Sequence, residues 1–492
     1  MANESPAEDI IKRRTVFYRS FGIYAEAGGF YDYGPIGLRM KRNIESEWRA
    51  MFPEAMGLVE IETSTILPEI VLKASGHLAT FTDPVATCGS CHTSYRLDKL
   101  LEEFYSARGD DEGLAEIRRM KLNDMLAKVE SNGIKCSRCG GRIGNPENFN
   151  LMFKTQIGQK GTDAAYLRPE TAQGIFMGFK DIYRSHGLRL PCGICQVGKV
   201  FRNEISPRQG LVRVREITQM ETELFIDKDA GFSGFGGIGS AELEAERIRF
   251  VKRGTGAEGE FSIKELLAEG AIPNEYLAVL LYKEKRLIER LGIGMEKYRF
   301  RQLDKEELPH YSAGNIDLEI KTSYGYIEVA GNADRGDYDL SSHAKLSNTD
   351  LGVISNEKKV LPHVAEASIG VDRLLFSVID GAVKDDGRGW KVLSLSKSMA
   401  PYMCSVFPLQ KDDGLISKAE EIHRELGKRR ISSYYSESGS IGKRYAKSDE
   451  IGIPNAITVD FDTLKDGTVT IRDRDTYKQV RKKISEVFEA VV

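Results

Sequence analysis

The stretch KVFRNEISPRQGLVRVREITQMETE, residues 199–223, decides the fold. Two strand-like arms flank a polar link, Ile205 to Gly210, which is too long for a two-residue hairpin turn. In the second arm the even positions are apolar and the odd positions are polar, with a break at Glu216 and Ile217. A period of two predicts one set in a core and the other on an open face of a sheet.

The polar face of this hairpin carries cations and carboxylates side by side. Arg202 and Glu204 end the first arm, while Arg213 and Arg215 stand on the return arm before its acidic end. Fixed charges of both signs suit a polyphosphate and an amine bound in one site. The alternative is a solvated hairpin with surface ion pairs, which the R-N-E triplet and the arginine-rich return arm disfavour.

Four further stretches follow one order along the chain: LRPETAQGIF at 167–176, SYGYIEVAG at 323–331, EASIGVDR at 366–373 and SGSIGKRYAKSDEIG at 438–452. With residues 199–223, they resemble the class II aminoacyl-tRNA synthetases, and among them most closely the glycine-specific family. The resemblance extends from YDYGPIGLRMKRNI near the start to RDRDT near the end. It implies an α+β catalytic core, built as an antiparallel sheet flanked by helices, with a zinc-knuckle insertion and a C-terminal α/β anticodon-binding domain.

The same resemblance implies glycine–tRNA ligase activity. Glycine would react with ATP to give glycyl-adenylate and pyrophosphate, and glycine would then pass to the 3′ end of tRNA(Gly). Negative charge develops on the α-phosphoryl oxygens in the first step, so a preorganised cation there lowers the barrier most directly. The matching catalytic residues are Arg202, at the α-phosphate, and Arg373, at the terminal phosphate. The alternative for Arg373 is a helix-start arginine paired with Asp372.

The nucleotide side of the expected site contains acids as well as arginines. Glu204 matches the adenine end, and Glu328 is expected to be the carboxylate linked to Mg²⁺, because Mg²⁺ on a polyphosphate takes few oxygen ligands from protein. The ATP-binding residues expected from the resemblance are Arg202, Asn203, Glu204, Arg213, Val214, Glu328, Val329 and Arg373.

The glycine side needs a grip on an ammonium group and exclusion of larger amino acids. Three carboxylates match the ammonium-side positions, and Ser368 matches the serine near the α-carbon, where an added methyl would clash. For each acid the alternative is a surface salt bridge. The expected glycine-binding residues are Glu170, Glu221, Glu366, Ala367 and Ser368. The family usually has proline where this chain has Ala367, which loosens the local backbone.

Six of the seven cysteines form C-x2-C pairs. Such pairs in a large chain of this kind indicate metal or core cysteine rather than disulfides. CGSC and CSRCGG contain glycine-bearing knuckles, which predicts a structural zinc site whose ligands are Cys88, Cys91, Cys136 and Cys139. The alternatives are unmetallated cysteines in a small insertion and a ligand role for His92.

The remaining pair, Cys192 and Cys195, precedes the first arm of the hairpin. Small buried thiols are common in cores, so this pair is interpreted as core packing. The alternative is a second metal or redox pair.

The expected organisation alternates core and inserted segments. Proline, a helix over Leu38 to Phe52 and the strand-like VEIET resemble motif 1, which in the family forms a homodimer interface; the alternative is an ordinary surface helix. The expected parts are 1–84 (catalytic core with motif 1), 85–148 (cysteine-rich zinc insertion), 149–227 (core with motif 2), 228–300 (mainly helical insertion), 301–398 (core with motif 3) and 399–492 (anticodon-binding domain).

The expected tRNA contacts lie in the last part. They are Lys443, Arg444 and Lys447, as phosphate contacts, and Tyr445, stacked on a base. The alternative for each is a solvated surface position. The chain has a net charge of −3, so a nucleic acid must be met by a local patch rather than by the field of the whole protein.

Composition excludes a membrane protein of the helical kind. No stretch approaches the roughly 20 apolar residues of a spanning helix, and the start, MANESPAEDIIKRR, has no apolar segment of signal-peptide type. A cytoplasmic location without a membrane partner is therefore expected.

Three other functions compete with the ligase. They are an inactive accessory subunit, an enzyme that activates an amino acid for another carrier, and a binding module built on the cysteine knuckles. The motif arginines disfavour the first, the anticodon-type domain the second, and the mixed charge around the knuckles the third.

Overall fold

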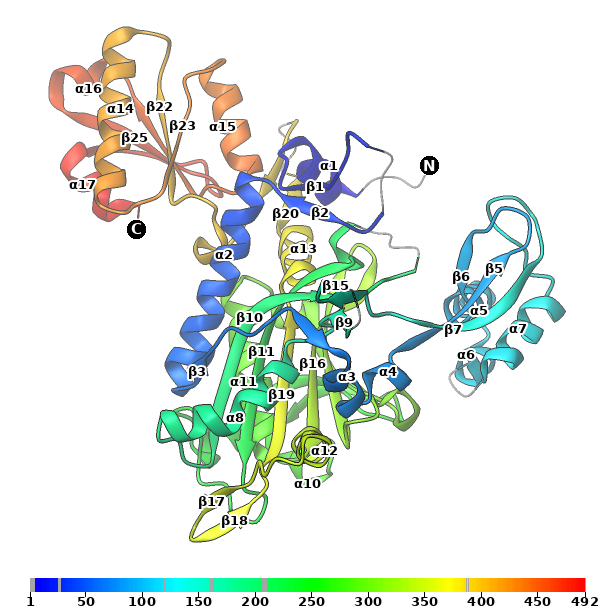
Figure 1. Cartoon of the computed structure of the whole chain (residues 1–492). Coiled ribbons are helices and arrows are strands. Elements are labelled where there is room, and N and C mark those ends of the chain that lie inside the picture. Colours follow the sequence, from blue (N-terminus) through cyan, green and yellow to red (C-terminus); the bar gives the residue numbers. More distant parts are fainter. Residues whose placement is uncertain are drawn as a thin grey trace.

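The computed structural model describes residues 5–24, 28–117, 120–159, 161, 163–205, 210–385, 387 and 389–491. Its centre is a nine-stranded mixed sheet (Figure 1). In order across the sheet the strands are β13 (Glu258–Ser262), β12 (Arg247–Val251), β14 (Tyr298–Gln302), β15 (Gly314–Thr322), β16 (Gly325–Gly336), β19 (His363–Gly370), β11 (Glu216–Ile226), β10 (Cys192–Phe201) and β3 (Val59–Glu60). Neighbouring strands are antiparallel except β12–β14 and β10–β3, which are parallel.

The predicted hairpin of residues 199–223 is present as β10 and β11, with Phe201 opposite Glu216. Most of the predicted link, residues 206–209, lies outside the described residues. The second arm begins later than predicted, because Gly210–Val212 forms a 3-10 turn. The backbone N–H of Arg215 donates to the Gly29 carbonyl at 2.8 Å, while its own carbonyl accepts from the N–H of Arg202 at 2.9 Å.

Both faces of β11 are buried, which corrects the expectation of one open face. Met220 and Leu224 lie in the main core with the helices α2 (Pro35–Arg49), α11 (Glu275–Arg290) and α13 (Val371–Ala382). Phe225 packs on the other side against α8 (Ala172–Ser185). Glu221 and Glu223 share the face of Phe225 and are 0% exposed. The polar face is therefore an interior surface.

Helix α2 begins at Pro35, three residues before the predicted start, and Ala50–Glu54 continues it as a π-turn. Proline is tolerated in a first turn, where the backbone N–H has no helical partner. Met40, Ile44 and Trp48 form its buried face, which packs against α13 in the main core.

Helix α11 buries an acid, Glu284, behind the central sheet. Its side chain is 0% exposed and accepts a hydrogen bond from Asn332 Nδ2 at 2.9 Å. Burial raises the pKa of Glu284 from 4.5 to about 8.

We expect this acid to make stability fall as pH rises. Between pH 4.5 and 8 the native state keeps a proton that the unfolded chain has released, so the free energy of unfolding decreases through that window, by roughly 4–5 kcal/mol in total, and levels off above it. Glu284→Gln should flatten the dependence of the urea midpoint on pH in this range. A variant that kept the full wild-type dependence would contradict this account.

Residues 228–300 contribute strands as well as helices. β12, β13 and β14 extend one edge of the central sheet, beside α9 (Ser240–Ala245) and α10 (Ile263–Ala268). The prediction of a mainly helical segment missed these strands because RIRFV, EGEFS and YRFRQ are rich in charge. Their arginines and glutamates form cross-strand pairs, such as Arg249 with Glu258.

A smaller layer lies beside the cysteine pairs. β5 (Thr82–Cys88) is central between β6 (Ser94–Arg96) and β7 (Ile143–Asn150), and Thr82 is opposite Asn150. The helices α5 (Leu97–Ser106), α6 (Asp111–Ile117) and α7 (Leu122–Ser131) pack here around their own apolar cluster. Figure 1 shows this layer in cyan, to one side of the central sheet. The chain thus leaves and re-enters the main body at neighbouring points.

The C-terminal residues form a separate five-stranded sheet, drawn in orange and red in Figure 1. Its strands, in spatial order, are β23 (Ser433–Tyr435), β22 (Cys404–Pro408), β24 (Asn455–Val459), β25 (Thr468–Asp473) and β26 (Gln479–Lys483), with helices α14 (Asp413–Lys428), α15 (Ile441–Glu450), α16 (Phe461–Asp466) and α17 (Ile484–Ala490). The sheet has its own apolar core.

The remaining elements are short and lie around the central sheet: α1 (Pro6–Arg13), β1 (Phe17–Arg19), β2 (Tyr31–Tyr33), β4 (Ile66–Pro68), α3 (Glu69–Ala74), α4 (His77–Thr80), β8 (Lys154–Ile157), β9 (Asp163–Leu167), α12 (Tyr338–Ser347), β17 (Val353–Ser355), β18 (Lys358–Val360), β20 (Val383–Asp385) and β21 (Lys391–Leu393). Among the described residues, no helix combines the length and apolar character needed to cross a membrane.

Candidate active site

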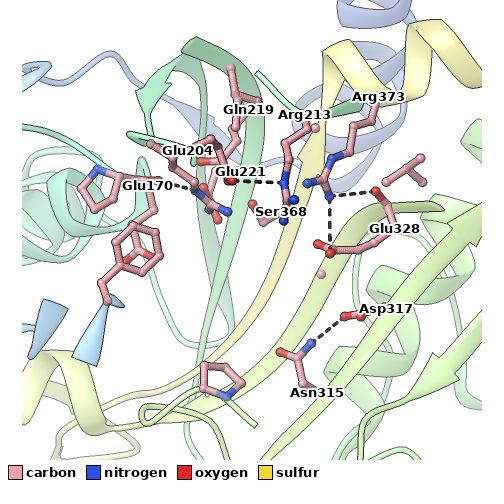
Figure 2. Close-up of a pocket in the computed structure, with 18 of the residues that line it drawn as sticks. Glu170, Glu204, Arg213, Gln219, Glu221, Asn315, Asp317, Glu328, Ser368 and Arg373 are labelled. Atoms are coloured by element: carbon pink, nitrogen blue, oxygen red, sulfur yellow. Dashed lines mark hydrogen bonds and ion pairs between the residues drawn. The ribbon is translucent and has the colours of Figure 1, made fainter. Parts of the chain in front are cut away.

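A cavity of about 790 Å³ opens over the central sheet, where β11, β16 and β19 lie side by side (Figure 2). It brings together most of the site residues predicted from the sequence: Glu170, Arg202, Glu204, Arg213, Val214, Glu221, Glu328, Val329, Glu366, Ser368 and Arg373. Asn203 and Ala367 are not among the residues that line it. Predicted residues from Glu170 to Arg373 thus meet at one surface.

The three arginines predicted from the sequence line the cavity, together with Arg96, which was not predicted. Arg202 Nε donates to the Pro169 carbonyl at 3.2 Å, and its guanidinium carbon lies 5.6 Å from the centroid of the Phe81 ring. Arg213 Nε lies 3.1 Å from Glu204 Oε2. Arg373 is the third. All three are partly exposed to the cavity, and Arg373 Nη1 lies 3.4 Å from Glu328 Oε2, so cations and carboxylates stand together on this side.

Arg373 is held from two directions. Its Nε donates to the Val212 carbonyl at 2.9 Å and its Nη1 to the Glu328 carbonyl at 3.0 Å. Asp372 is buried and instead accepts from the backbone N–H of Thr218 at 2.6 Å and from the Tyr33 hydroxyl. The helix-start acid is therefore engaged with β11 rather than with Arg373.

A second carboxylate accompanies Glu328 on this side. Asp317 on β15 lines the same cavity and accepts from Asn315 Nδ2 at 3.0 Å. Burial, with the nearby Glu328, raises the pKa of Asp317 well above its usual range. A divalent cation would relieve this unfavourable pairing, and two carboxylates are the oxygen donors that Mg²⁺ prefers. Asp317 was not predicted as a site residue, because it lies outside the motifs that carry the family resemblance.

The acidic side of the cavity is organised by an arginine that the sequence analysis did not single out. Arg335, at the end of β16, has a fully buried side chain. It donates to Asp339 at 2.7 and 3.0 Å, to Glu170 at 3.3 Å, and to Glu366. Two of the three predicted ammonium-side acids thus share one cation.

The buried acids differ in their electrostatics. Burial alone would raise the pKa of Glu170, but Arg335 and His77 hold it well below its usual range. Burial and the charge of Glu170 raise the pKa of Glu221, whose Oε2 accepts from Thr171 Oγ1 at 2.7 Å. Burial raises the pKa of Glu366 well above its usual range, despite Arg335. These acids are not surface salt bridges.

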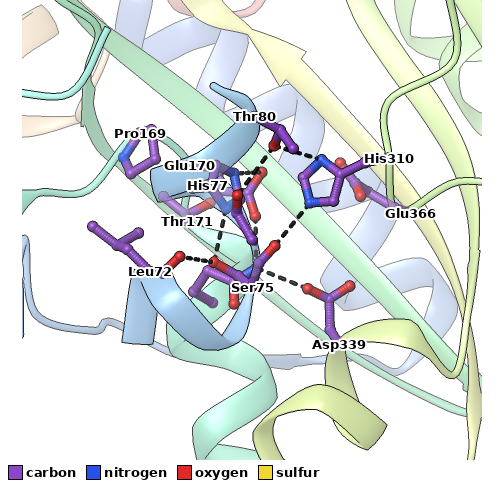
Figure 3. A network of polar contacts seen from close by, with 12 residues as sticks. Leu72, Ser75, His77, Thr80, Pro169, Glu170, Thr171, His310, Asp339 and Glu366 are labelled. Carbon is purple, nitrogen blue, oxygen red and sulfur yellow. Dashed lines mark hydrogen bonds and ion pairs between the residues drawn. The ribbon is translucent and has the colours of Figure 1, made fainter. Parts of the chain in front are cut away.

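Two histidines close the wall next to Glu170 (Figure 3). His77 Nε2 lies 3.3 Å from Glu170 Oε2, and His77 Nδ1 lies 2.8 Å from Ser75 Oγ. His310 Nε2 bonds the Ser75 carbonyl at 2.8 Å. Gly76 has φ +80°, and a Cβ there would lie 2.7 Å from His310 Nε2. Glycine at this position therefore permits the contact between His310 and the Ser75 carbonyl. No local signal in the sequence relates these two histidines.

Ser368 and Ala367 occupy different faces of β19. Ser368 is opposite Glu221 and lines the cavity, while Ala367 is opposite Thr222 and is 1% exposed. Alternation turns the Ala367 side chain away from the cavity. β19 is paired on both sides, a position where proline would remove a ladder hydrogen bond. The departure from the family pattern therefore affects the backbone rather than the lining.

The four knuckle cysteines converge, as expected. The Sγ atoms of Cys88 and Cys139 lie 3.5 Å apart, as do those of Cys91 and Cys136, and all four lie within 4.8 Å of one another. Four sulfurs at the usual Zn–S distance from one ion would be roughly 3.8 Å apart. The donor set therefore fits a closed tetrahedral thiolate site. His92 is not part of this group.

Cys192 and Cys195 lie in different apolar clusters, on opposite faces of β10. Both are buried, and burial raises the pKa of Cys192 to about 12. This agrees with core packing and argues against one shared metal or redox site.

Comparisons with known proteins agree with this geometry. Residues 153–233 match the tRNA synthetase class II core domain (G, H, P, S and T), and residues 403–492 match the anticodon binding domain. The chain is 36% identical to the glycine–tRNA ligase of Aeropyrum pernix, over 98% of this chain and 95% of the relative. It is 35% identical to that of Methanothermobacter thermautotrophicus, over 99% and 98% of the two chains.

The chain belongs to the glycine–tRNA ligase family. A third member, from Pyrococcus furiosus, is 37% identical over 98% of this chain and 97% of the relative. Among solved structures, the Giardia lamblia prolyl-tRNA synthetase in complex with prolyl-adenylate aligns with a TM-score of 0.60 and 16% identity, over 98% of this chain and 75% of that chain. The predicted fold class is thereby confirmed: a class II synthetase core with an anticodon-binding domain.

In this glycine–tRNA ligase family member, the four predicted tRNA residues of the anticodon-binding domain differ in burial and in hydrogen bonding. Arg444 is buried, and its guanidinium donates to the carbonyls of Pro408, Ser436 and Leu409, so it is not presented to a phosphate. Tyr445 OH lies 2.6 Å from Thr458 Oγ1.

The two lysines of the set differ from these residues. Lys443 is exposed, whereas Lys447 is half-buried, with its Nζ 5.3 Å from the centroid of the Tyr434 ring. Lys443 keeps the exposure that a backbone contact needs.

Proposed function

We propose that the protein activates glycine with ATP, forming glycyl-adenylate and pyrophosphate, and then transfers glycine to the 3′ end of tRNA(Gly). The observation that carries this proposal is that one cavity is lined both by the motif arginines Arg202, Arg213 and Arg373 and by a pocket of buried acids. The arginines suit the phosphates of a nucleotide, and the acids suit the ammonium group of an amino acid. The two ligands must lie side by side for the carboxylate to attack the α-phosphorus. Glycine and tRNA(Gly) are inferred as the substrates from the names of the relatives.

On the nucleotide side, Arg202 is proposed to contact the α-phosphate, where charge increases as the glycine carboxylate attacks phosphorus. Arg373 is proposed to hold the terminal phosphate. Glu204 is proposed to face the adenine end, and Arg213 to make a second contact with the nucleotide. A cation fixed before the reaction stabilises the developing charge without reorganisation. The Val212 and Glu328 carbonyls would orient Arg373 in this way.

Mg²⁺ would be held by Glu328 together with Asp317, and when bound it would offset charge on the polyphosphate. The protein residues do the rest: they align the carboxylate with the α-phosphorus and limit access of water.

On the glycine side, the ammonium group is proposed to lie against Glu221 and Glu366, with Glu170 at the wall formed by His77. Ser368 lies on the cavity face of β19, opposite Glu221. We propose that it stands near the α-carbon, where a methyl group would meet its side chain. Steric exclusion of this kind separates glycine from alanine better than a missing contact could.

The test is aminoacylation of total tRNA with each of glycine, alanine, serine and proline. Charging with glycine alone, onto tRNA that carries a glycine anticodon, is the expected result. Charging with alanine or serine would keep the enzyme class and overturn the glycine assignment. A truncation at residue 398 should retain adenylate formation but lose charging, because the C-terminal residues 399–492 are proposed to engage the tRNA.

We further propose a homodimer, cytoplasmic localisation and the division at 84, 148, 227, 300 and 398. The resemblance to class II synthetases supports the dimer, through the motif 1 helix α2. Light scattering of the purified protein should give twice 54.9 kDa. A monomer that charges tRNA would contradict the dimer.

Zinc is proposed for the four-cysteine site, and its removal has a local expected effect. We expect about one zinc per chain by elemental analysis. Cys136→Ser should abolish zinc binding and expose residues 82–150 to rapid amide exchange, because structural zinc supplies folding free energy. Cys192→Ser is the matched control and should keep the zinc. Full zinc content in the Cys136 variant would contradict the assignment.

A further inference from the structure

Glu223 is a buried carboxylate that the proposed chemistry leaves without a role. It stands two residues after Glu221 on β11, directly opposite Glu366 on β19, and is 0% exposed. Neither of its oxygens has a hydrogen-bond partner within the part of the chain that the structure describes. An ionised carboxylate in such a place is strongly destabilising, so a proton or an incoming cation must offset its charge.

Glu223 belongs to a compact acid group. Carboxylate oxygens of Glu221, Glu223 and Glu366 lie within 4.8 Å of one another, and all three side chains are buried. Glu221 and Glu366 are close enough to share a hydrogen bond when one of them carries a proton. Buried carboxylates this close cannot all ionise, as in dyads that share one proton.

The surrounding charges leave the group negative. Those that act on Glu223 from the elements packed around it are Glu366 on β19, Arg335 on β16, Glu221 on β11 and Asp339 on α12. Next to them lie Glu170, His77 on α4, Tyr311, and His343 on α12, which bonds Gln173. Arg335 provides one positive charge, and it already forms ion pairs with Asp339, Glu170 and Glu366. Burial and then the charge of Glu366 raise the pKa of Glu223 well above its usual range.

We infer that Glu221, Glu223 and Glu366 hold a shared proton in the empty pocket and release it to solvent when the ammonium group of glycine binds. The inference rests on the proposed function, because glycine is the ligand. The ammonium charge replaces the charge of the proton, and no covalent bond changes. Glu223 does not line the cavity, so it is a positioning residue that acts through Glu221 and Glu366.

Proton release makes glycine affinity depend on pH in a defined direction. While the amine stays protonated, affinity rises with pH, by up to about tenfold per pH unit for one proton released. The shared proton also reduces the repulsion among these three carboxylates when no glycine is present. The acids can therefore be buried without unfolding the sheet.

Calorimetric titration of the full-length protein with glycine tests this inference. At pH 7, in buffers with different heats of protonation, we expect the wild type to release close to one proton per glycine. Glu223→Gln keeps the shape of the side chain and should release less than half of that. Glu284→Gln is the matched control, because it removes another buried acid behind the same sheet, and its release should equal that of the wild type.

The outcomes separate the two proposals. Glycine binding by the wild type with the same heat in every buffer would overturn the proton inference and leave the proposed function standing. No glycine binding at any concentration would overturn both. The wild-type titration decides even where Glu223→Gln does not fold, and a folded Glu223→Gln protein with undiminished release would remove Glu223 from the account.

Discussion

Arg202→Ala should lower glycine-dependent ATP–pyrophosphate exchange by about 10²–10³-fold, which corresponds to about 3–4 kcal/mol of transition-state stabilisation. The Pro169 carbonyl and the Phe81 ring hold this guanidinium at the cavity before substrate arrives. Its charge is needed most as the α-phosphoryl oxygens gain negative charge. The loss should therefore appear in kcat more than in KM for ATP.

Lys199→Ala is the matched control for this variant. Lys199 is a cation three residues earlier, on β10, and its pair with Glu216 at 3.1 Å is solvent-exposed. Exposed pairs contribute about 0–1 kcal/mol, so exchange should stay within a few-fold of the wild type. Equal activities of the Arg202 and Lys199 variants would contradict the role proposed for Arg202.

Arg335→Met should cost about 3–5 kcal/mol of stability at pH 7 and abolish measurable glycine binding. The substitution leaves Glu170, Glu366 and Asp339 buried without their shared cation. Protonation of these acids lessens the cost, so the stability difference from the wild type should shrink as pH falls. Urea unfolding at pH 5 and pH 8 measures this.

Arg472→Met separates lost stability from lost recognition. Arg472 donates to both oxygens of Asp449 at 2.8 Å in the C-terminal sheet, and both side chains are buried. This variant should also be destabilised, but it should keep the wild-type KM for glycine in exchange. An Arg335→Met protein with unchanged KM for glycine would contradict the role of Arg335 in the acid pocket.

The central sheet could be predicted where side-chain periodicity is strong. The two arms predicted within residues 199–223 are strands, and β10 and β11 extend beyond them to Cys192 and Ile226. The alternation of Val212 and Val214 was misleading, because Gly210–Val212 forms a 3-10 turn. Edge strands such as RIRFV look like solvated helix, since their charges pair only across a sheet.

The site residues also divide into those that could be predicted from the sequence and those that could not. Residues inside matched motifs, such as Arg202, Glu221 and Arg373, do converge on one cavity. Arg335 and Asp317 do not belong to any motif that the sequence shows. Their importance comes from burial beside acids that are distant in the sequence. Arg444 was predicted as a phosphate contact because it lies in a stretch that resembles the anticodon-binding domain, whereas its buried guanidinium donates to backbone carbonyls.

The most direct test of the central claim is ATP–pyrophosphate exchange measured with each of the twenty amino acids. The account predicts exchange with glycine alone, lost in Arg202→Ala. Exchange with alanine or serine at comparable rates would contradict the glycine pocket. No exchange with any amino acid, from a folded protein, would contradict the claim itself and favour an accessory nucleic-acid-binding role.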